Sequence, residues 1–254
     1  MKDSVVKDRL ILALDVPTTA EARKLVATLR DHVGMFKVGS QLFTAGGPDF
    51  VRELVGSGAR VFLDLKFHDI PNTVAAASVA ASRLGVSILN LHALGGSEMM
   101  RRTAAAVSET AEREGLARPA IIAVTVLTSA DASTLAEVGI APDPQARAVA
   151  LARLADDCGL DGVVASPHEI RPLRAAIARR DFLIVTPGVR PQSATRDDQK
   201  RVMTPGEATR AGADYLVIGR AIINQPDPVR AAQRILDEME AASRSADSPR
   251  ETTA

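Results

Sequence analysis

The feature that most constrains the fold of this chain is a regular alternation of short apolar runs with longer amphipathic segments. Each run has the length of a β-strand, and each intervening segment has the composition and period of a helix. The eight runs are Leu10–Asp15, Met35–Gly39, Arg60–Lys66, Ser87–His92, Ala120–Thr125, Asp161–Ser166, Phe182–Thr186 and Tyr215–Gly219. Eight strands that alternate with helices predict a single (β/α)₈ TIM barrel. An open doubly wound sheet is the competing architecture, but no G-x-G-x-x-G turn follows the first run.

The composition indicates one large globular domain followed by a polar tail. Hydrophobic residues make up 46% of the 254 residues, which is enough for a sizeable core. We therefore assign residues 1–242 to the barrel. Residues 243–254 are rich in Ser, Arg, Asp and Thr, and we expect this tail to be disordered.

Charge and cysteine content exclude several classes of protein. The formal net charge is zero and no strongly basic segment is present, so we expect no nucleic-acid partner. Cys158 is the only cysteine, so no internal disulfide can form. The apolar run near the N-terminus is too short for a signal peptide or a membrane span, which predicts a cytoplasmic protein with no membrane partner.

Charged residues occur at strand ends where the barrel interior is expected. Because strand side chains alternate between two faces, Lys37, Asp64 and Lys66 are predicted to point inward, and Asp15 is predicted to follow Ala13 on the inner face. Asp69 follows three residues after Lys66, and we expect all five groups to meet at one mouth of the barrel. Buried charge is costly, and charge at the carboxyl ends of barrel strands indicates catalysis. The alternative is an ion-pair network that only lines the barrel.

Two segments near the C-terminus predict an anion site. Thr186-Pro187-Gly188-Val189-Arg190 ends the seventh run, and Gly219-Arg220 ends the eighth. Glycine lets the backbone approach a ligand closely, arginine suits phosphate oxygens, and barrels bind phosphate at these two loops. The alternative is a pair of turn glycines with surface arginines. Two long loops, from Leu127 to about Pro144 and from Pro187 to about Arg201, are expected to act as lids.

These motifs resemble those of the orotidine 5′-phosphate decarboxylase family over about residues 9–232. The signature-like segment is Asp64-Leu65-Lys66-Phe67-His68-Asp69-Ile70-Pro71-Asn72-Thr73. The other matching segments are Leu12–Asp15, Phe36–Gly39, Leu127–Ser129, Thr186–Arg190 and Val217–Arg220, in the order of the family. The resemblance implies decarboxylation of orotidine 5′-monophosphate (OMP) to UMP and CO₂, the last step of de novo pyrimidine nucleotide synthesis, without a metal or organic cofactor.

The resemblance also implies a role for each matching residue. Lys66 would protonate C6 of the product, within an alternating charged tetrad whose other members are Lys37, Asp64 and Asp69. The protein would be a homodimer in which Asp69 and Thr73 serve the neighbouring subunit's site. The remaining substrate contacts implied are Asp15, Ile70, Thr128, Ser166, Pro187, Arg190, Gln199, Gly219 and Arg220.

Two other functions remain open from the sequence. Related barrels that decarboxylate a keto-sugar phosphate share Asp-x-Lys-x-x-Asp, resemble Mg²⁺-dependent lyases and tend to carry an acidic residue where Lys37 stands. A non-catalytic binder of a phosphoribosyl ligand is the second alternative. The four histidines do not form a recognisable ligand set, so we expect no metal site.

Overall fold

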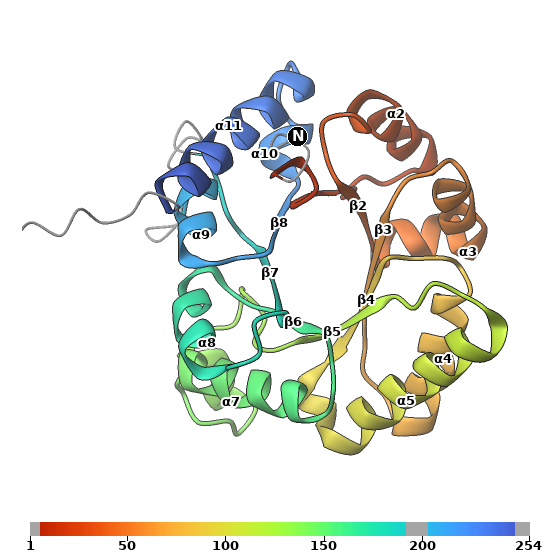
Figure 1. Ribbon diagram of the computed structural model, residues 1–254, viewed down its shortest axis with the longest axis vertical. Coiled ribbons are helices and arrows are strands. Elements are labelled where there is room, and N and C mark those ends of the chain that lie inside the picture. The colour runs from red at the N-terminus through yellow and green to blue at the C-terminus, as the bar shows by residue number, and fades with distance from the viewer. Residues whose placement is uncertain (1–5, 192–202, 247–254) are drawn as a thin grey trace, which may run out of the picture.

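A computed structural model describes residues 6–191 and 203–246 of the chain. Eight parallel strands close into a barrel in the order β1 to β8, and β8 pairs with β1 (Figure 1). The strands are β1 Leu10–Ala13, β2 Met35–Gly39, β3 Val61–Phe67, β4 Ile88–His92, β5 Ala120–Val124, β6 Gly162–Val164, β7 Leu183–Pro187 and β8 Tyr215–Ile218. The predicted (β/α)₈ barrel is therefore confirmed, and each strand lies within one residue of a predicted apolar run.

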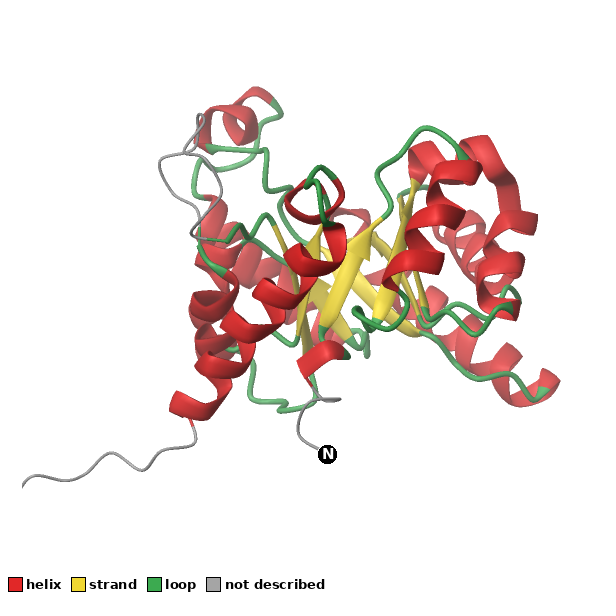
Figure 2. Cartoon of the chain, turned by 90° about the horizontal axis from the view of Figure 1, so that it is seen from above, coloured by secondary structure: helices red, strands yellow, loops and turns green. Residues whose placement is uncertain are grey.

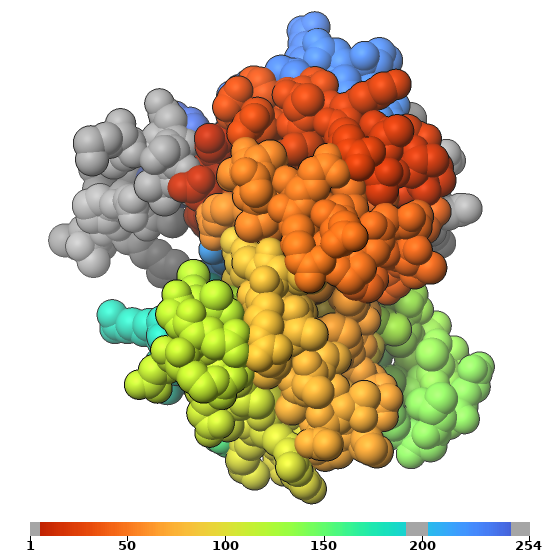
Figure 3. All heavy atoms as spheres, turned by 90° about the vertical axis from the view of Figure 1, so that its right-hand side faces the viewer, coloured from red at the N-terminus to blue at the C-terminus, as the bar shows by residue number. Residues whose placement is uncertain are grey.

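Helices surround the barrel on its outside, as Figure 2 shows from a second direction. They are α2 Thr19–Leu29, α3 Ser40–Gly56, α4 Pro71–Ser82, α5 Gly96–Glu114, α6 Ala132–Glu137, α7 Pro144–Asp157, α8 Ile170–Ala176, α9 Pro205–Ala211, α10 Arg220–Ile223 and α11 Pro228–Ala246, with 3₁₀ turns η1 Ala93–Gly95 and η2 Pro167–Glu169. Helices α2 to α5 form one continuous side of the surface (Figure 3). None of the helices in the described ranges is long and apolar enough to cross a membrane.

Local sequence signals explain where several helices begin. The Thr18 side chain accepts the Glu21 N–H at the start of α2, and Thr204 with Glu207 forms a capping box at α9. Proline occupies the first position of α4, where its missing N–H costs nothing. The loop after β5 contains a short helix, α6, that the sequence did not predict. Helix α11 continues through Ala246, and residues 247–254 of the expected tail lie outside the described residues.

The apolar core has two parts, as strand alternation requires. The larger part fills the space between the strands and the helices. The smaller part fills the barrel interior and consists of Ile11, Ala13, Met35, Phe62, Ile88, Ile122, Val185 and Val217. Because the interior is packed with these side chains, a ligand site has to lie above them, at the carboxyl ends of the strands.

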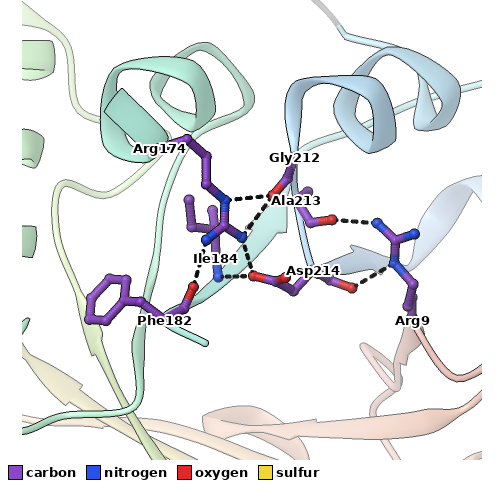
Figure 4. Close-up of polar contacts among 7 residues, drawn as sticks. All are labelled: Arg9, Arg174, Phe182, Ile184, Gly212, Ala213 and Asp214. Carbon is purple, nitrogen blue, oxygen red and sulfur yellow. Dashed lines mark hydrogen bonds and ion pairs between the residues drawn. The ribbon is translucent and has the colours of Figure 1, made fainter. Parts of the chain in front are cut away.

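The amino ends of β7 and β8 are joined by arginine and aspartate side chains (Figure 4). The Asp214 carboxylate accepts the Ile184 N–H at 2.6 Å and pairs with Arg174, which also donates to the carbonyls of Phe182 and Gly212. Arg9 donates to the carbonyls of Ala213 and Asp214. These contacts lie at the end of the barrel opposite the predicted site, so we assign them to stability.

Candidate active site

Four of the five predicted charged residues form an alternating chain at the carboxyl ends of β1, β2 and β3. The strand register places Ala13 beside Lys37 and Gly39 beside Asp64. The Lys37 Nζ lies 3.1 Å from an Asp15 oxygen and 3.3 Å from Asp64 Oδ2. The Lys66 Nζ lies 2.6 Å from Asp64 Oδ1. The order is thus Asp15, Lys37, Asp64, Lys66, with opposite charges adjacent at every step.

The centre of this chain is largely withdrawn from solvent. Lys37 is 9% exposed and Asp64 is 8% exposed. Burial alone would raise the pKa of Asp64, but the charges of Lys37 and Lys66, together with hydrogen bonds from Lys66 and Asn90, lower it below its ordinary value. Asp64 is therefore a buried carboxylate that its cationic neighbours hold in the ionised form.

Lys66 has an unusual backbone conformation. Its φ is +52°, which makes it the one non-glycine residue with positive φ in the described part of the chain. It lies where the β3–β4 register shifts, because Leu63 pairs with Leu89 but Phe67 pairs with Leu91. Such irregularities re-aim a side chain and are common beside active sites.

Asp69, Ile70 and Thr73 are solvent-exposed, and Ile70 is 66% exposed. The Asp69 carboxylate accepts the Ile70 N–H at 2.6 Å and makes no ion pair with any other described residue. Within one chain, Asp69 therefore does not join the other four charges. The strand ends at Phe67, so the alternation that placed Asp64 and Lys66 no longer applies at Asp69.

One of the two predicted anion loops lies next to this chain of charges. Gly219 follows β8 and caps α10, and a Cβ there would approach Ala13 Cβ to 3.2 Å and Asp15 Oδ2 to 3.3 Å. Gly188 follows Pro187 with φ +82°, and the Arg190 N–H donates to the Met203 carbonyl. Arg220 is exposed. Gln199 lies outside the described residues.

Comparison with known proteins decides the family. Residues 8–235 match the model of the "Orotidine 5'-phosphate decarboxylase / HUMPS family". The chain belongs to this family. It is 57% identical over 233 residues to a Geobacter sulfurreducens protein named orotidine 5′-phosphate decarboxylase, covering 92% of this chain and 96% of the relative. A Moorella thermoacetica protein of the same name is 56% identical over 235 residues, covering 92% and 93%.

A solved structure agrees with this assignment to the orotidine 5′-phosphate decarboxylase family. The enzyme of that name from Lactobacillus acidophilus superposes with a TM-score of 0.79 at 36% identity, covering 91% of this chain and 98% of that one. The family resemblance inferred from the motifs is therefore confirmed.

Two further predicted site residues follow strands on the same face of this family's barrel. Ser166 follows β6 and is half-buried, and its N–H donates to the buried Glu169 carboxylate at 2.8 Å. Thr128 lies in the exposed loop after β5. Among the described residues, neither Ser166 nor Thr128 forms a hydrogen bond with the four linked charges.

The sequence reasoning missed Asn90 and Glu169. Asn90 is fully buried in β4 and contacts both Asp64 and Lys66. A polar residue at the inward position between Ile88 and His92 was the available signal. Glu169 is buried and lies three positions after Ser166, which is the spacing of a capping box.

The histidines near the site do not form a metal centre in the part of the chain that the structure describes. His68 and His92 face each other with ring centroids 5.4 Å apart. Burial, with a smaller contribution from His68 and Lys66, lowers the pKa of His92. Across residues 6–191 and 203–246, no three His, Cys, Asp or Glu side chains are grouped in a way that could hold a metal ion.

Proposed function

We propose that this chain decarboxylates OMP to UMP and CO₂, the final step of de novo pyrimidine nucleotide synthesis. Family membership and the names of close relatives support the reaction. The single structural observation that carries it is the alternating chain Asp15–Lys37–Asp64–Lys66 at the barrel mouth. We also propose that the reaction takes place in the cytoplasm and uses no metal or organic cofactor.

Lys66 is the proposed proton donor. When the bond from C6 to the carboxylate breaks, CO₂ leaves and the electron pair stays on C6, where little delocalisation is available. The Lys66 ammonium stabilises that developing charge more than it stabilises the substrate, which lowers the barrier. It then gives a proton to C6 and completes UMP.

Asp64 and Lys37 orient the donor. Asp64 accepts a hydrogen bond from Lys66 at 2.6 Å and forms an ion pair with Lys37 at 3.3 Å, so one carboxylate holds both cations. Asp64 is also proposed to lie near the departing carboxylate, where like-charge repulsion is relieved as neutral CO₂ leaves. Stabilisation of the C6 charge by Lys66 is proposed to lower the barrier more than this repulsion does, because stabilisation of developing charge is usually the largest contribution to catalysis.

The remaining predicted residues bind the parts of OMP that do not react. Asp15 and Lys37 are proposed to contact the ribose, and Ser166 the pyrimidine. Pro187, Arg190, Gly219 and Arg220 would hold the phosphate, with Thr128 and Gln199 in the loops that close over it. Binding energy at the phosphate, remote from C6, can drive closure and exclude water.

A second subunit is proposed to complete the site. Asp69, Ile70 and Thr73 are exposed, and Asp69 has no link to Lys66 of its own chain among the described residues. An exposed acidic group beside a large exposed apolar side chain suits an interface between two copies. The homodimer would place Asp69 and Thr73 in the neighbouring site, where Asp69 completes the tetrad.

The test is the fall in OMP absorbance with purified protein. Wild type is expected to turn over with or without excess EDTA, and Lys66→Ala should reduce kcat by at least about 10⁴-fold, because it removes a proton donor and a charge stabiliser together. Lys24→Ala, an exposed lysine on α2, is the matched control and should leave kcat unchanged.

The other functions give different results in the same assay. A metal-dependent decarboxylase of keto-sugar phosphates would not decarboxylate OMP, and it would lose its activity on keto-sugar phosphates in EDTA. A non-catalytic binder would hold UMP tightly and release no CO₂ from OMP. Either result would overturn the proposal.

A further inference from the structure

Asn90 is a fully buried amide in the interior of the barrel. It lies in β4 between Ile88, which belongs to the interior apolar cluster, and His92. Its register partner on β5 is the apolar Ile122. A buried amide is costly unless its hydrogen bonds are made, so its partners show what it does.

Both partners of Asn90 belong to the chain of charges. Its Oδ1 accepts the backbone N–H of Lys66 at 2.8 Å, and its Nδ2 donates to Asp64 Oδ1 at 2.7 Å. These contacts lie where the β3–β4 register shifts, between Leu63 and Phe67. The amide therefore spans the irregular part of β3 and binds its two charged residues.

Chemistry fixes the orientation of the amide. The Lys66 N–H can only donate, and the ionised Asp64 carboxylate can only accept, so the oxygen must face Lys66 and the NH₂ must face Asp64. Asparagine supplies one acceptor and one donor at this spacing. Aspartate in its ionised form would keep the acceptor and lose the donor, and leucine would lose both.

The two hydrogen bonds of Asn90 act on the Lys66 backbone and on the Asp64 carboxylate, which together place the proposed proton donor. One holds Lys66 in its positive-φ conformation, which non-glycine residues rarely adopt. The other leaves Asp64 Oδ1 shared between Asn90 and the Lys66 ammonium, 2.6 Å away. Asn90 thus holds the backbone of Lys66 directly and holds its side chain through Asp64.

We propose that Asn90 is a positioning residue that sets the direction of the Lys66 ammonium and the orientation of the Asp64 carboxylate. The inference rests on the proposed decarboxylation for its effect on turnover. Asn90 itself acts through Lys66 and Asp64.

The first test separates turnover from binding. Asn90→Leu and Asn90→Asp should each lower kcat for OMP by about 10²-fold, the effect of a small misplacement of a reacting group. KM for OMP and Kd for UMP should change by less than about threefold, since the phosphate loops are untouched. Ser78→Ala, a fully buried polar residue on α4, is the matched control and should keep wild-type kcat.

The pH profile of Asn90→Asp gives a readout that a packing role would not move. The charged or titratable groups around the new carboxyl are Asp64 and Lys66 on β3, Lys37 on β2, and His92 with His68 beside it. A protonated carboxyl can donate to Asp64 and accept from Lys66, as the amide does. The ratio of variant to wild-type kcat should therefore rise at least about tenfold as the pH falls and the new group binds a proton.

Crystal structures of the two variants separate this proposal from the function itself. In Asn90→Leu, Lys66 should leave the positive-φ region, or its Nζ should move away from Asp64 Oδ1. If Lys66 and Asp64 keep their wild-type geometry in both variants, or if kcat stays within threefold of wild type, Asn90 does not position them. If wild type fails to decarboxylate OMP, the proposed function fails, and the structures still decide whether Asn90 holds Lys66.

Discussion

Lys66 joins an unfavourable backbone conformation to the proposed chemistry. A left-handed conformation costs an ordinary residue about 1–2 kcal/mol, because its Cβ approaches the backbone too closely. Lys66 adopts φ +52° at a register shift in β3, held by Asn90 and by the Asp64 ion pair. The surrounding barrel therefore maintains a local strain that points the ammonium along the chain of charges.

Replacing Lys66 in two ways should reveal this strain. Lys66→Ala and Lys66→Gly both remove the ammonium, but only glycine adopts positive φ without a steric penalty. Lys66→Gly should therefore be more stable to unfolding than Lys66→Ala by about 1 kcal/mol, although glycine is normally the less stable choice in a strand. Urea denaturation of both variants measures the difference. If Lys66→Ala is as stable to unfolding as Lys66→Gly, or more stable, the backbone at this position is not strained.

At the scale of single elements, the turn after β6 contains a buried acid. Glu169 lies in η2, is 6% exposed, and accepts the Ser166 N–H. Burial raises the pKa of Glu169 from 4.5 to about 7, and the Ser166 hydrogen bond only partly offsets this. The folded protein therefore holds a proton between about pH 5 and 7 that the unfolded chain has released.

This raised pKa predicts a pH-dependent contribution to stability. Because the folded state binds the extra proton, the contribution is fully present below pH 4.5 and is lost as the pH rises to about 7, by about 3 kcal/mol in total. Glu169→Gln carries no titrating group, so its stability relative to wild type should increase from pH 5 to pH 8. Urea unfolding of both proteins at the two pH values tests this. A difference that is independent of pH would contradict the assignment.

The strands β7 and β8 are tied together at their amino ends by Asp214. Its carboxylate accepts the Ile184 N–H and pairs with the Arg174 guanidinium, so Asp214→Ala removes the acceptor of one backbone donor and one ion pair (Figure 4). We expect a loss of about 2 kcal/mol, moderated by the partial exposure of the pair. Asp49→Ala, whose exposed carboxylate pairs with Arg52, should cost less than about 0.5 kcal/mol.

Activity distinguishes stability from catalysis in this pair of variants. Asp214 lies at the end of the barrel opposite the charged residues, so Asp214→Ala should keep kcat below its melting temperature. Thermal unfolding and OMP turnover are measured on the same samples. A large fall in kcat for folded Asp214→Ala would contradict the division of roles between the two ends of the barrel.

At the scale of the whole molecule, the proposed dimer predicts complementation between two inactive proteins. Lys66→Ala and Asp69→Ala homodimers should each be nearly inactive. If Asp69 serves the neighbouring site, a mixed dimer contains one site with both residues intact, so a 1:1 mixture should regain about one quarter of all sites.

The control mixture for complementation is Lys66→Ala with the double variant Lys66→Ala/Asp69→Ala. It cannot form an intact site, so it should stay inactive. Native mass spectrometry shows whether subunits exchange. If they exchange and mixing the two single variants restores no turnover, the assignment of Asp69 to the partner's site is wrong.

Local pattern predicted much of this protein. The apolar runs located all eight strands, and alternation correctly pointed Lys37 and Asp64 into the barrel, because both signals depend only on neighbouring residues. The same signal says nothing about Asp69, because the period of two ends where β3 ends at Phe67.

The sequence by itself therefore determined the barrel, the strands and the inward charges. Only the tertiary structure decided how the charges pair, that Lys66 takes a positive φ, and that Asn90 binds both Asp64 and Lys66. Those features depend on the register between strands that are 20 or more residues apart, as in Asn90 and Lys66, which are separated by 24 positions. Register is set by the closing of the whole barrel, and no local pattern encodes it.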